Sequence, residues 1–196
     1  MNKIFSQKHS FDYTADTQRV FHAMLEALSN PGEPRSIAEP ASRFAGNGPW
    51  LAAAATLLDN EVTYFWNGDA DCGAEIGYLT GSVPAPARDA DFLLLPEKTD
   101  PSAFLPLVKA GTHEAPHTSA TLIIGSDGEP AASCELSGPG VPPGGRRLAL
   151  SEYEREWLLS RGALGLEYPL GVELIFLRNG GDITAVTRKV EVKWLT

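Results

Sequence analysis

The stretch Val172-Glu-Leu-Ile-Phe-Leu177 constrains the fold more than any other part of the chain. Successive side chains of a strand point to opposite faces. One face then carries Val172, Leu174 and Phe176, and the other carries Ile175 and Leu177. A strand with two apolar faces is typical of the middle of a sheet that is covered on both sides. The sequence therefore predicts a layered fold built around this strand.

A β-hairpin is predicted at the same place. The strand begins after a Pro-Leu-Gly corner at Tyr168–Gly171, and Asn179-Gly-Gly-Asp182 follows it with residues that tolerate positive φ. Ile183–Thr187 then extends the chain again as the second strand of the hairpin. Val190–Leu195 is predicted to be an extended strand at an edge.

Helices and short apolar strands alternate in the rest of the chain, which indicates an α/β fold. The predicted helices are Thr17–Leu28, Trp50–Leu58, Ala74–Leu79, Pro101–Lys109 and Ser151–Leu164. The predicted strands are Arg35–Ile37, Val62–Trp66, Asp91–Leu95, Thr121–Ile124 and Ala132–Leu136. The last two are expected to pair with each other in antiparallel fashion. With the hairpin, this pair predicts a mixed β-sheet flanked by helices.

Two helix starts carry recognisable capping residues. Asp16 is expected to cap the first helix, whose apolar stripe consists of Val20, Phe21, Met24, Leu25 and Leu28. Ser151 with Glu154 three residues later matches a capping box.

The length of 196 residues suits one α/β domain with a short arm. We predict an N-terminal arm over residues 1–15 and a single domain over residues 16–196. The arm carries Phe5, Phe11 and Tyr13, which either pack on a neighbouring subunit or cover their own chain.

Composition excludes several classes of protein. A net charge of −9 argues against a nucleic acid as the main partner, because phosphate binding depends on Lys and Arg. No apolar run approaches the ~20 residues of a membrane helix, and the N-terminus lacks the apolar core of a signal peptide. The two cysteines, Cys72 and Cys134, lie far apart and indicate reduced, packed thiols. We therefore expect a cytoplasmic protein without a metal centre.

His113-Glu-Ala-Pro-His117 matches the zinc-binding pattern H-E-x-x-H in its letters only. That pattern needs a regular helix that presents both imidazoles on one face. Pro116 lies inside the turn that would have to be helical, and proline in a helix interior costs about 3 kcal/mol. We interpret the segment as a loop.

The segment 138–145 is rich in glycine and proline and precedes Arg146 and Arg147. It matches neither phosphate-binding loop pattern, and its prolines remove backbone N–H groups that would hold a phosphate. We interpret the loop as a rigid turn or an interface loop, and the two arginines keep an anion site as the alternative. Arg188 follows a core strand and is a candidate for a ligand crevice or for a salt bridge at an interface.

No constellation for catalysis is visible in the sequence. There is no G-x-S-x-G motif, and none of the six lysines lies in an apolar context at a strand end that would suit Schiff-base chemistry. The residues alone predict an α/β protein without a recognisable catalytic residue, and no cofactor.

The order of several short motifs resembles the PhnH family, a subunit of the bacterial carbon–phosphorus lyase core complex. These motifs are Phe21 to Leu28 followed by Ser29-Asn-Pro-Gly32, Leu57-Leu-Asp59, Gly111-Thr112 with Ala120-Thr-Leu122, Leu136-Ser-Gly-Pro-Gly-Val141 and Tyr168-Pro-Leu-Gly-Val-Glu-Leu174. The resemblance covers about residues 15–192. The chain departs from the family pattern at Glu173, where aspartate is usual, and at Val186-Thr-Arg-Lys189, where Pro-Arg-Thr-Thr is usual.

The resemblance implies a fold related to the pyridoxal-phosphate-dependent transferases, without the cofactor. It implies a homodimer that joins the other carbon–phosphorus lyase core subunits, which form ribose 1-methylphosphonate 5-triphosphate from ATP and methylphosphonate. Structural roles are expected for the prolines and glycines of its motifs, Pro31, Gly32, Gly138, Pro139, Gly140, Pro169 and Gly171.

Two functional hypotheses follow. The first is a structural or assembly subunit that has no complete chemistry of its own. The second is a transferase domain that binds nucleotide or phosphonate through arginines such as Arg146, Arg147 and Arg188.

Overall fold

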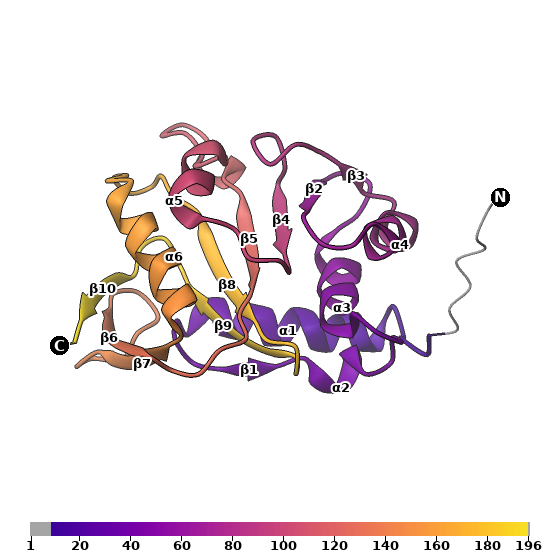
Figure 1. Ribbon diagram of the computed structural model, residues 1–196, viewed down its shortest axis with the longest axis horizontal. Coiled ribbons are helices and arrows are strands. Elements are labelled where there is room, and N and C mark those ends of the chain that lie inside the picture. Colours follow the sequence, from indigo (N-terminus) through magenta and orange to yellow (C-terminus); the bar gives the residue numbers. More distant parts are fainter. Residues whose placement is uncertain (1–8, 196) are drawn as a thin grey trace.

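A seven-stranded mixed sheet forms the centre of the protein in the computed structural model, which describes residues 9–195 (Figure 1). Its strands lie in the order β1-β9-β8-β5-β4-β2-β3. They are β1 Arg35–Ser36, β2 Thr63–Trp66, β3 Val83–Pro84, β4 Phe92–Leu95, β5 Thr121–Gly125, β8 Glu173–Leu177 and β9 Asp182–Val186. β9 is antiparallel to both of its neighbours, and the remaining pairs are parallel. The predicted α/β class with a mixed sheet is confirmed.

Six α-helices and two 3₁₀ turns are present among the described residues. They are α1 Ala15–Ser29, α2 Ala38–Ala41, α3 Gly48–Leu57, α4 Ala70–Thr80, α5 Pro101–Phe104, η1 Leu105–Leu107, η2 Pro116–Thr118 and α6 Glu152–Ala163. None of these helices is long and apolar enough to cross a membrane. The capping box at the start of α6 is confirmed, with Ser151 and Glu154 each bonding the other's backbone N–H.

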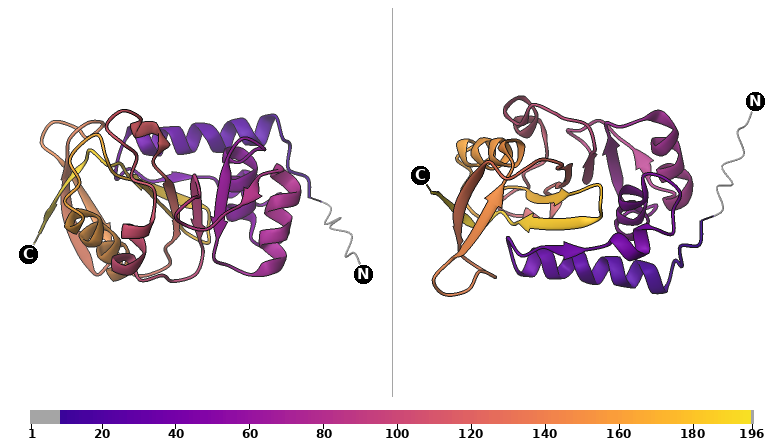
Figure 2. Two further views of the ribbon diagram at one scale, coloured as in Figure 1. Left: turned by 90° about the horizontal axis from the view of Figure 1, so that it is seen from above. Right: turned by 60° about the horizontal axis from the view of Figure 1, so that its bottom comes forward.

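The helices cover both faces of the large sheet and produce two hydrophobic cores. Residues of α1, α3 and α4 pack on one face, and residues of η1 and α6 pack on the other. Figure 2 shows α1 and α6 on opposite sides of the central strands. Alternate side chains of one strand serve different cores, since Ile123 faces α1 and α3 whereas Leu122 and Ile124 face α6.

The predicted hairpin is confirmed as β8 and β9. Ile175 and Leu177 lie in the core beneath α1, and Leu174 and Phe176 lie in the core beneath α6. All four side chains are at most 1% exposed. Gly181 has a φ of +88° in the turn that joins the strands, as a tight turn at this place requires.

The predicted pairing of residues 132–136 with residues 121–124 is wrong. Both edges of β5 are occupied by the parallel strands β4 and β8. The segment is β6, Ala132–Ser137, in a second antiparallel sheet with β7, Arg146–Leu150, and β10, Glu191–Trp194. Cys134 and Leu136 are buried, whereas their neighbours Ser133, Glu135 and Ser137 are more exposed, which is the pattern of a strand with one covered face.

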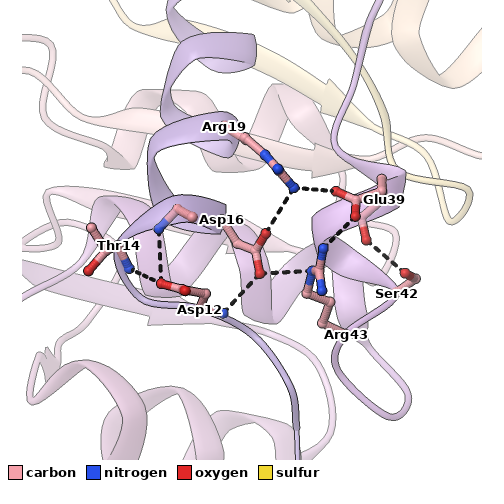
Figure 3. Close-up of polar contacts among 8 residues, drawn as sticks. Asp12, Thr14, Asp16, Arg19, Glu39, Ser42 and Arg43 are labelled. Atoms are coloured by element: carbon pink, nitrogen blue, oxygen red, sulfur yellow. Dashed lines mark hydrogen bonds and ion pairs between the residues drawn. The ribbon is translucent and has the colours of Figure 1, made fainter.

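The N-terminal end of α1 differs from the prediction. Asp16 lies within the first turn instead of capping it, and its buried carboxylate lies 2.8 Å from Nε of Arg43 (Figure 3). The N-cap residue is Thr14, which makes no side-chain capping hydrogen bond, and Oδ1 of Asp12 in the preceding turn accepts hydrogen bonds from the backbone N–H groups of Thr14 and Ala15 at 2.8 and 2.9 Å. In the predicted stripe of α1, Val20 and Met24 are buried, but Phe21 and Leu25 are about half exposed.

The segment before α1 packs on its own chain as far as the structure describes it. Phe11 is buried and stacks on Phe44, with ring centroids 4.7 Å apart. Tyr13 is exposed, and Phe5 lies outside the described residues. The division into an arm and a single domain stays a prediction.

The predicted helix over 101–109 is shorter in the structure. The α-helix ends at Phe104 and continues only as the 3₁₀ turn Leu105–Leu107. Pro106 explains the change, because proline lacks the N–H of an α-helical hydrogen bond and its ring clashes with the preceding turn. In contrast, α4 begins earlier than predicted, because the Asp69 side chain caps it by accepting a hydrogen bond from the Cys72 N–H.

Both cysteines are free and buried, one in each core. Burial raises the pKa of the Cys72 thiol to about 12 and that of the Cys134 thiol to about 11. Because only the thiolate reacts with an alkylating reagent, we expect both side chains to react slowly at pH 8 in the folded protein.

We therefore predict that iodoacetamide labels the folded chain at least about 100-fold more slowly than the urea-unfolded chain. Mass spectrometry of timed samples measures the rates at each cysteine. Rapid labelling of Cys72 in the folded protein, with Cys134 protected, would show that α4 opens locally and that its packing is weaker than described.

Candidate functional site

Arg188 lies two residues after the end of β9 and binds three other segments of the chain. Its backbone N–H and its Nε both donate to the carboxylate of Glu173, at the start of β8. Its Nη1 donates to the carbonyl oxygens of Pro116 and Pro169 at 3.1 and 3.2 Å, and its Nη2 donates to Oγ of Ser119 at 2.6 Å. We call this group of residues the Arg188 cluster.

The corner before β8 is shaped to fit this cluster. The Tyr168–Pro169 peptide bond is cis, and Gly171 has a φ of +131°. A Cβ atom added at Gly171 would lie 3.2 Å from Cβ of Arg188, which is closer than most real contacts of that kind. Glycine at this position therefore lets the corner and Arg188 pack together.

The Arg188 cluster lies at the amino ends of the parallel strands. Thr121, the first residue of β5, pairs with Glu173, the first residue of β8. Ligands of open α/β sheets usually bind at the opposite, carboxyl ends of the strands. The position of the cluster and the four hydrogen bonds of the Arg188 side chain both favour a structural role for this residue.

Arg146 forms a second cluster of the same kind. Its Nη1 donates to the carbonyl oxygens of Asn30 and Pro31 at 2.9 and 2.8 Å, and its Nη2 lies 2.9 Å from Oε2 of Glu33. This guanidinium joins the start of β7 to the turn that ends α1. We call these residues the Arg146 cluster.

The glycine loop between β6 and β7 lies close to both clusters. A Cβ atom at Gly140 would lie 2.3 Å from the carbonyl oxygen of Ser29, and one at Gly138 would lie 3.1 Å from the carbonyl oxygen of Lys189. Pro31 and Gly32 are buried in the turn at the end of α1, whereas Pro139 is exposed at the tip of the loop. Gly138 and Gly140 thus lie against the segment after β9 and the end of α1, and the role of the loop as a rigid turn or an interface loop stays a prediction.

The three candidate arginines do not form one site. Arg146 and Arg188 share no hydrogen-bond partner, and Arg147 points to the other face of β7. Arg147 is exposed, and its one hydrogen bond is a long one of 3.4 Å to Oγ of Ser133.

A hollow of about 350 Å³ lies beside the Arg188 cluster, between η2 and the corner before β8. Exposed His117 and Lys189 line it, and Nζ of Lys189 lies 4.6 Å from the ring centroid of Tyr168. His113 and His117 share no α-helix, because the chain forms only the 3₁₀ turn η2 around Pro116. The geometry that a zinc-binding H-E-x-x-H helix needs is not found in this segment.

Comparison with known proteins gives one decisive finding. The family model described as bacterial phosphonate metabolism protein (PhnH) matches residues 9–193. The chain belongs to the PhnH family. A search of curated proteins found no match. PhnH membership connects the chain with bacterial phosphonate metabolism. Four of the sequence motifs that resemble the family meet at the Arg146 and Arg188 clusters.

The sequence of this PhnH chain did not indicate the role of one further charged residue in this region. Arg161, in the last turn of α6, donates from Nη1 to the carbonyl oxygens of Val186 and Thr187 at 2.7 and 3.1 Å. Basic residues are common in the last turn of a helix. The position of Arg161 in the sequence therefore did not indicate that it binds carbonyl groups at the end of β9.

Proposed function

We propose that this chain is a subunit of the carbon–phosphorus lyase core complex with a structural or assembly role. The complex forms ribose 1-methylphosphonate 5-triphosphate from ATP and methylphosphonate, and this chain is required for that step without complete chemistry of its own. We also propose that it acts as a homodimer in the cytoplasm. Membership of the PhnH family supports the pathway, and the use of the arginines supports the role.

The observation that carries the assembly role is that the two best candidate arginines are already engaged within the chain. Arg146 and Arg188 each bind a carboxylate and two backbone carbonyl groups. A guanidinium with these partners is poorly placed to bind a phosphonate as well. In contrast, Phe21 and Leu25 lie one turn apart on α1 and are 52% and 49% exposed, which suits contact with another subunit.

A relation to the pyridoxal-phosphate-dependent transferase fold belongs to the same proposal. The mixed α/β architecture is compatible with it. The four lysines within residues 9–195 are Lys98, Lys109, Lys189 and Lys193, and none of them is buried in an apolar pocket. Lys109 is paired with Asp91. These lysines are unsuited to forming a Schiff base with the cofactor.

The test is co-purification of the tagged chain with the other core subunits. We expect the wild type to bring down these subunits and to form a dimer. The double variant Phe21→Ser with Leu25→Ser is expected to lower one of these associations at least about tenfold, because exposed apolar side chains at an interface contribute strongly to binding. Sedimentation velocity and quantitative gel analysis measure both associations.

Leu107→Ser is the matched control, since Leu107 is 59% exposed and lies on η1, away from α1. It should leave both associations unchanged. Failure of the wild type to recover any core subunit would overturn the proposal. So would turnover of ATP and methylphosphonate by the isolated chain.

The second candidate function is a transferase domain with its own anion site. The hollow beside the Arg188 cluster favours it, because His117 and Lys189 are exposed there and Lys189 has no carboxylate partner among residues 9–195. Calorimetry with ATP and methylphosphonate tests this hypothesis. Binding that is lost in Lys189→Ala but kept in the exposed control Lys193→Ala would support it, and the absence of heat would end it.

A further inference from the structure

A hollow of about 510 Å³ lies between the end of α6, the corner before β8 and strand β10. Its walls are partly apolar, with contributions from Leu158, Leu164, Val172, Val192 and Trp194. This volume is within the range of small-molecule sites, which are mostly apolar with a few polar groups that fix the ligand. Arg188 lines both this hollow and the one that His117 and Lys189 line, and the two hollows share no other lining residue.

Arg161 lines this hollow and lacks a carboxylate partner among the described residues. Its hydrogen bonds are the two from Nη1 to the end of β9 and one of 3.5 Å from Nη2 to the carbonyl oxygen of Val190. Arg146 and Arg188, by comparison, each pair with a carboxylate. Arg161 is thus an uncompensated cation in a protein of net charge −9.

Burial lowers the pKa of Arg161 to about 10, which leaves the guanidinium charged at neutral pH. Arg161 is partly buried, and a charge that has lost part of its water is stabilised by an opposite charge nearby. Glu173 acts on Arg161 from a distance but is bound to Arg188, and Glu191 at the wall of the hollow is exposed to solvent. An anion in the hollow would supply the missing compensation.

The free edge of the guanidinium suggests which anion fits. Nε of Arg161 makes no hydrogen bond to residues 9–195, and Nη2 makes only the long one. Nε and Nη2 form one edge of the guanidinium, and such an edge binds the two oxygens of a carboxylate through parallel hydrogen bonds.

We propose that this hollow binds a carboxylic acid with an apolar chain. The carboxylate pairs with Nε and Nη2 of Arg161, and the apolar chain lies against Leu158, Val192 and Trp194. The inference stands on the hollow and on Arg161 and does not rest on the proposed function.

Calorimetry on the full chain with three probes tests the proposal. Hexanoate carries both features of the ligand, acetate carries only the carboxylate, and hexan-1-ol carries only the apolar chain. We expect hexanoate to bind at least about tenfold more tightly than either of the others. Equal binding of hexanoate and hexan-1-ol would overturn the role of Arg161, and no binding of hexanoate would overturn the proposal.

Two variants test whether hexanoate binds in this hollow. Gly162→Phe places a ring in the hollow, because Gly162 lines it and an added Cβ atom meets nothing within 4 Å. Arg161→Gln removes the charge. Each is expected to weaken hexanoate binding at least about tenfold, and Arg147→Gln, on the exposed face of β7, is the control that leaves it unchanged.

Gly162→Phe keeps the test decisive if Arg161→Gln does not fold. Unchanged hexanoate binding in a folded Gly162→Phe variant would place the ligand elsewhere and overturn the proposal. If hexanoate does not bind, and Gly162→Phe instead prevents association with another subunit, the hollow accepts a protein segment and the small-molecule proposal is wrong.

Discussion

Replacing Arg188 with alanine is expected to lower the free energy of unfolding by about 3 kcal/mol, because it removes one half of a largely buried ion pair. The side chains of Arg188 and Glu173 are only 16% and 20% exposed. Without the guanidinium, the Glu173 carboxylate loses its ion-pair partner at a place with little water around it. The carbonyl groups of Pro116 and Pro169 and the hydroxyl of Ser119 also lose their donor. Urea unfolding followed by circular dichroism measures the change.

Arg88→Ala is the matched control for this prediction. Arg88 also pairs with a carboxylate, that of Asp89, but its side chain is 76% exposed. Its removal should change the free energy of unfolding by less than about 0.5 kcal/mol, since exposed ion pairs contribute little. The double variant of Arg188 and Glu173 should be less destabilised than the sum of the single variants by about 2 kcal/mol. A loss below about 1 kcal/mol for Arg188→Ala would contradict the structural role and favour a ligand role for this residue.

The strands of the large sheet could be predicted because their signal is local. Each face of β8 is apolar, and the period of two assigns Leu174 and Ile175 to different cores without knowledge of the neighbouring elements. The hairpin turn follows from the glycines beside Asp182. In these segments, short-range geometry and burial favour the same structure, so the sequence was sufficient.

The partner of β6 could not be predicted in the same way. Two apolar runs separated by a turn, 121–124 and 132–136, suggest a hairpin, but β5 has no free edge once β4 and β8 are in place. The alternative partner, β7, is a short strand with two arginines at its start, and its alternation of Leu148 and Leu150 with exposed residues is a weak signal. Competition for strand edges is a property of the whole sheet and is not visible in one segment.

The roles of the arginines could not be predicted from the sequence, for a related reason. Arg146 binds the carbonyl oxygens of Asn30 and Pro31, which are 116 and 115 residues away. Backbone carbonyl groups are present at every residue, so no side-chain pattern marks them as partners. The family motifs did indicate the right segments, since the turn at Pro31 and the loop at Gly140 meet in space. The sequence thus identified the segments that matter, and only the structure shows that these segments contact one another.

Gly140→Ala is expected to lower the free energy of unfolding by about 3 kcal/mol or more, for two reasons that add. Gly140 has a φ of +78°, a conformation that costs an L-residue roughly 1–2 kcal/mol. The added Cβ atom would also lie 2.3 Å from the carbonyl oxygen of Ser29 and 2.8 Å from Cδ of Pro31, so the loop or the end of α1 must move. Such overpacking typically costs a further 1–3 kcal/mol, or about as much as the strain itself.

Gly144→Ala separates the two contributions within the same loop. Gly144 also has a positive φ, +101°, but an added Cβ atom there meets nothing within 4 Å. It should therefore show the backbone strain alone, about 1–2 kcal/mol, in the same urea experiment. The difference between the two variants measures how tightly the loop is held against the turn after α1. If Gly140→Ala and Gly144→Ala are equally destabilised, the loop moves away at little cost, and the Arg146 cluster does not depend on the contact between Gly140 and Ser29.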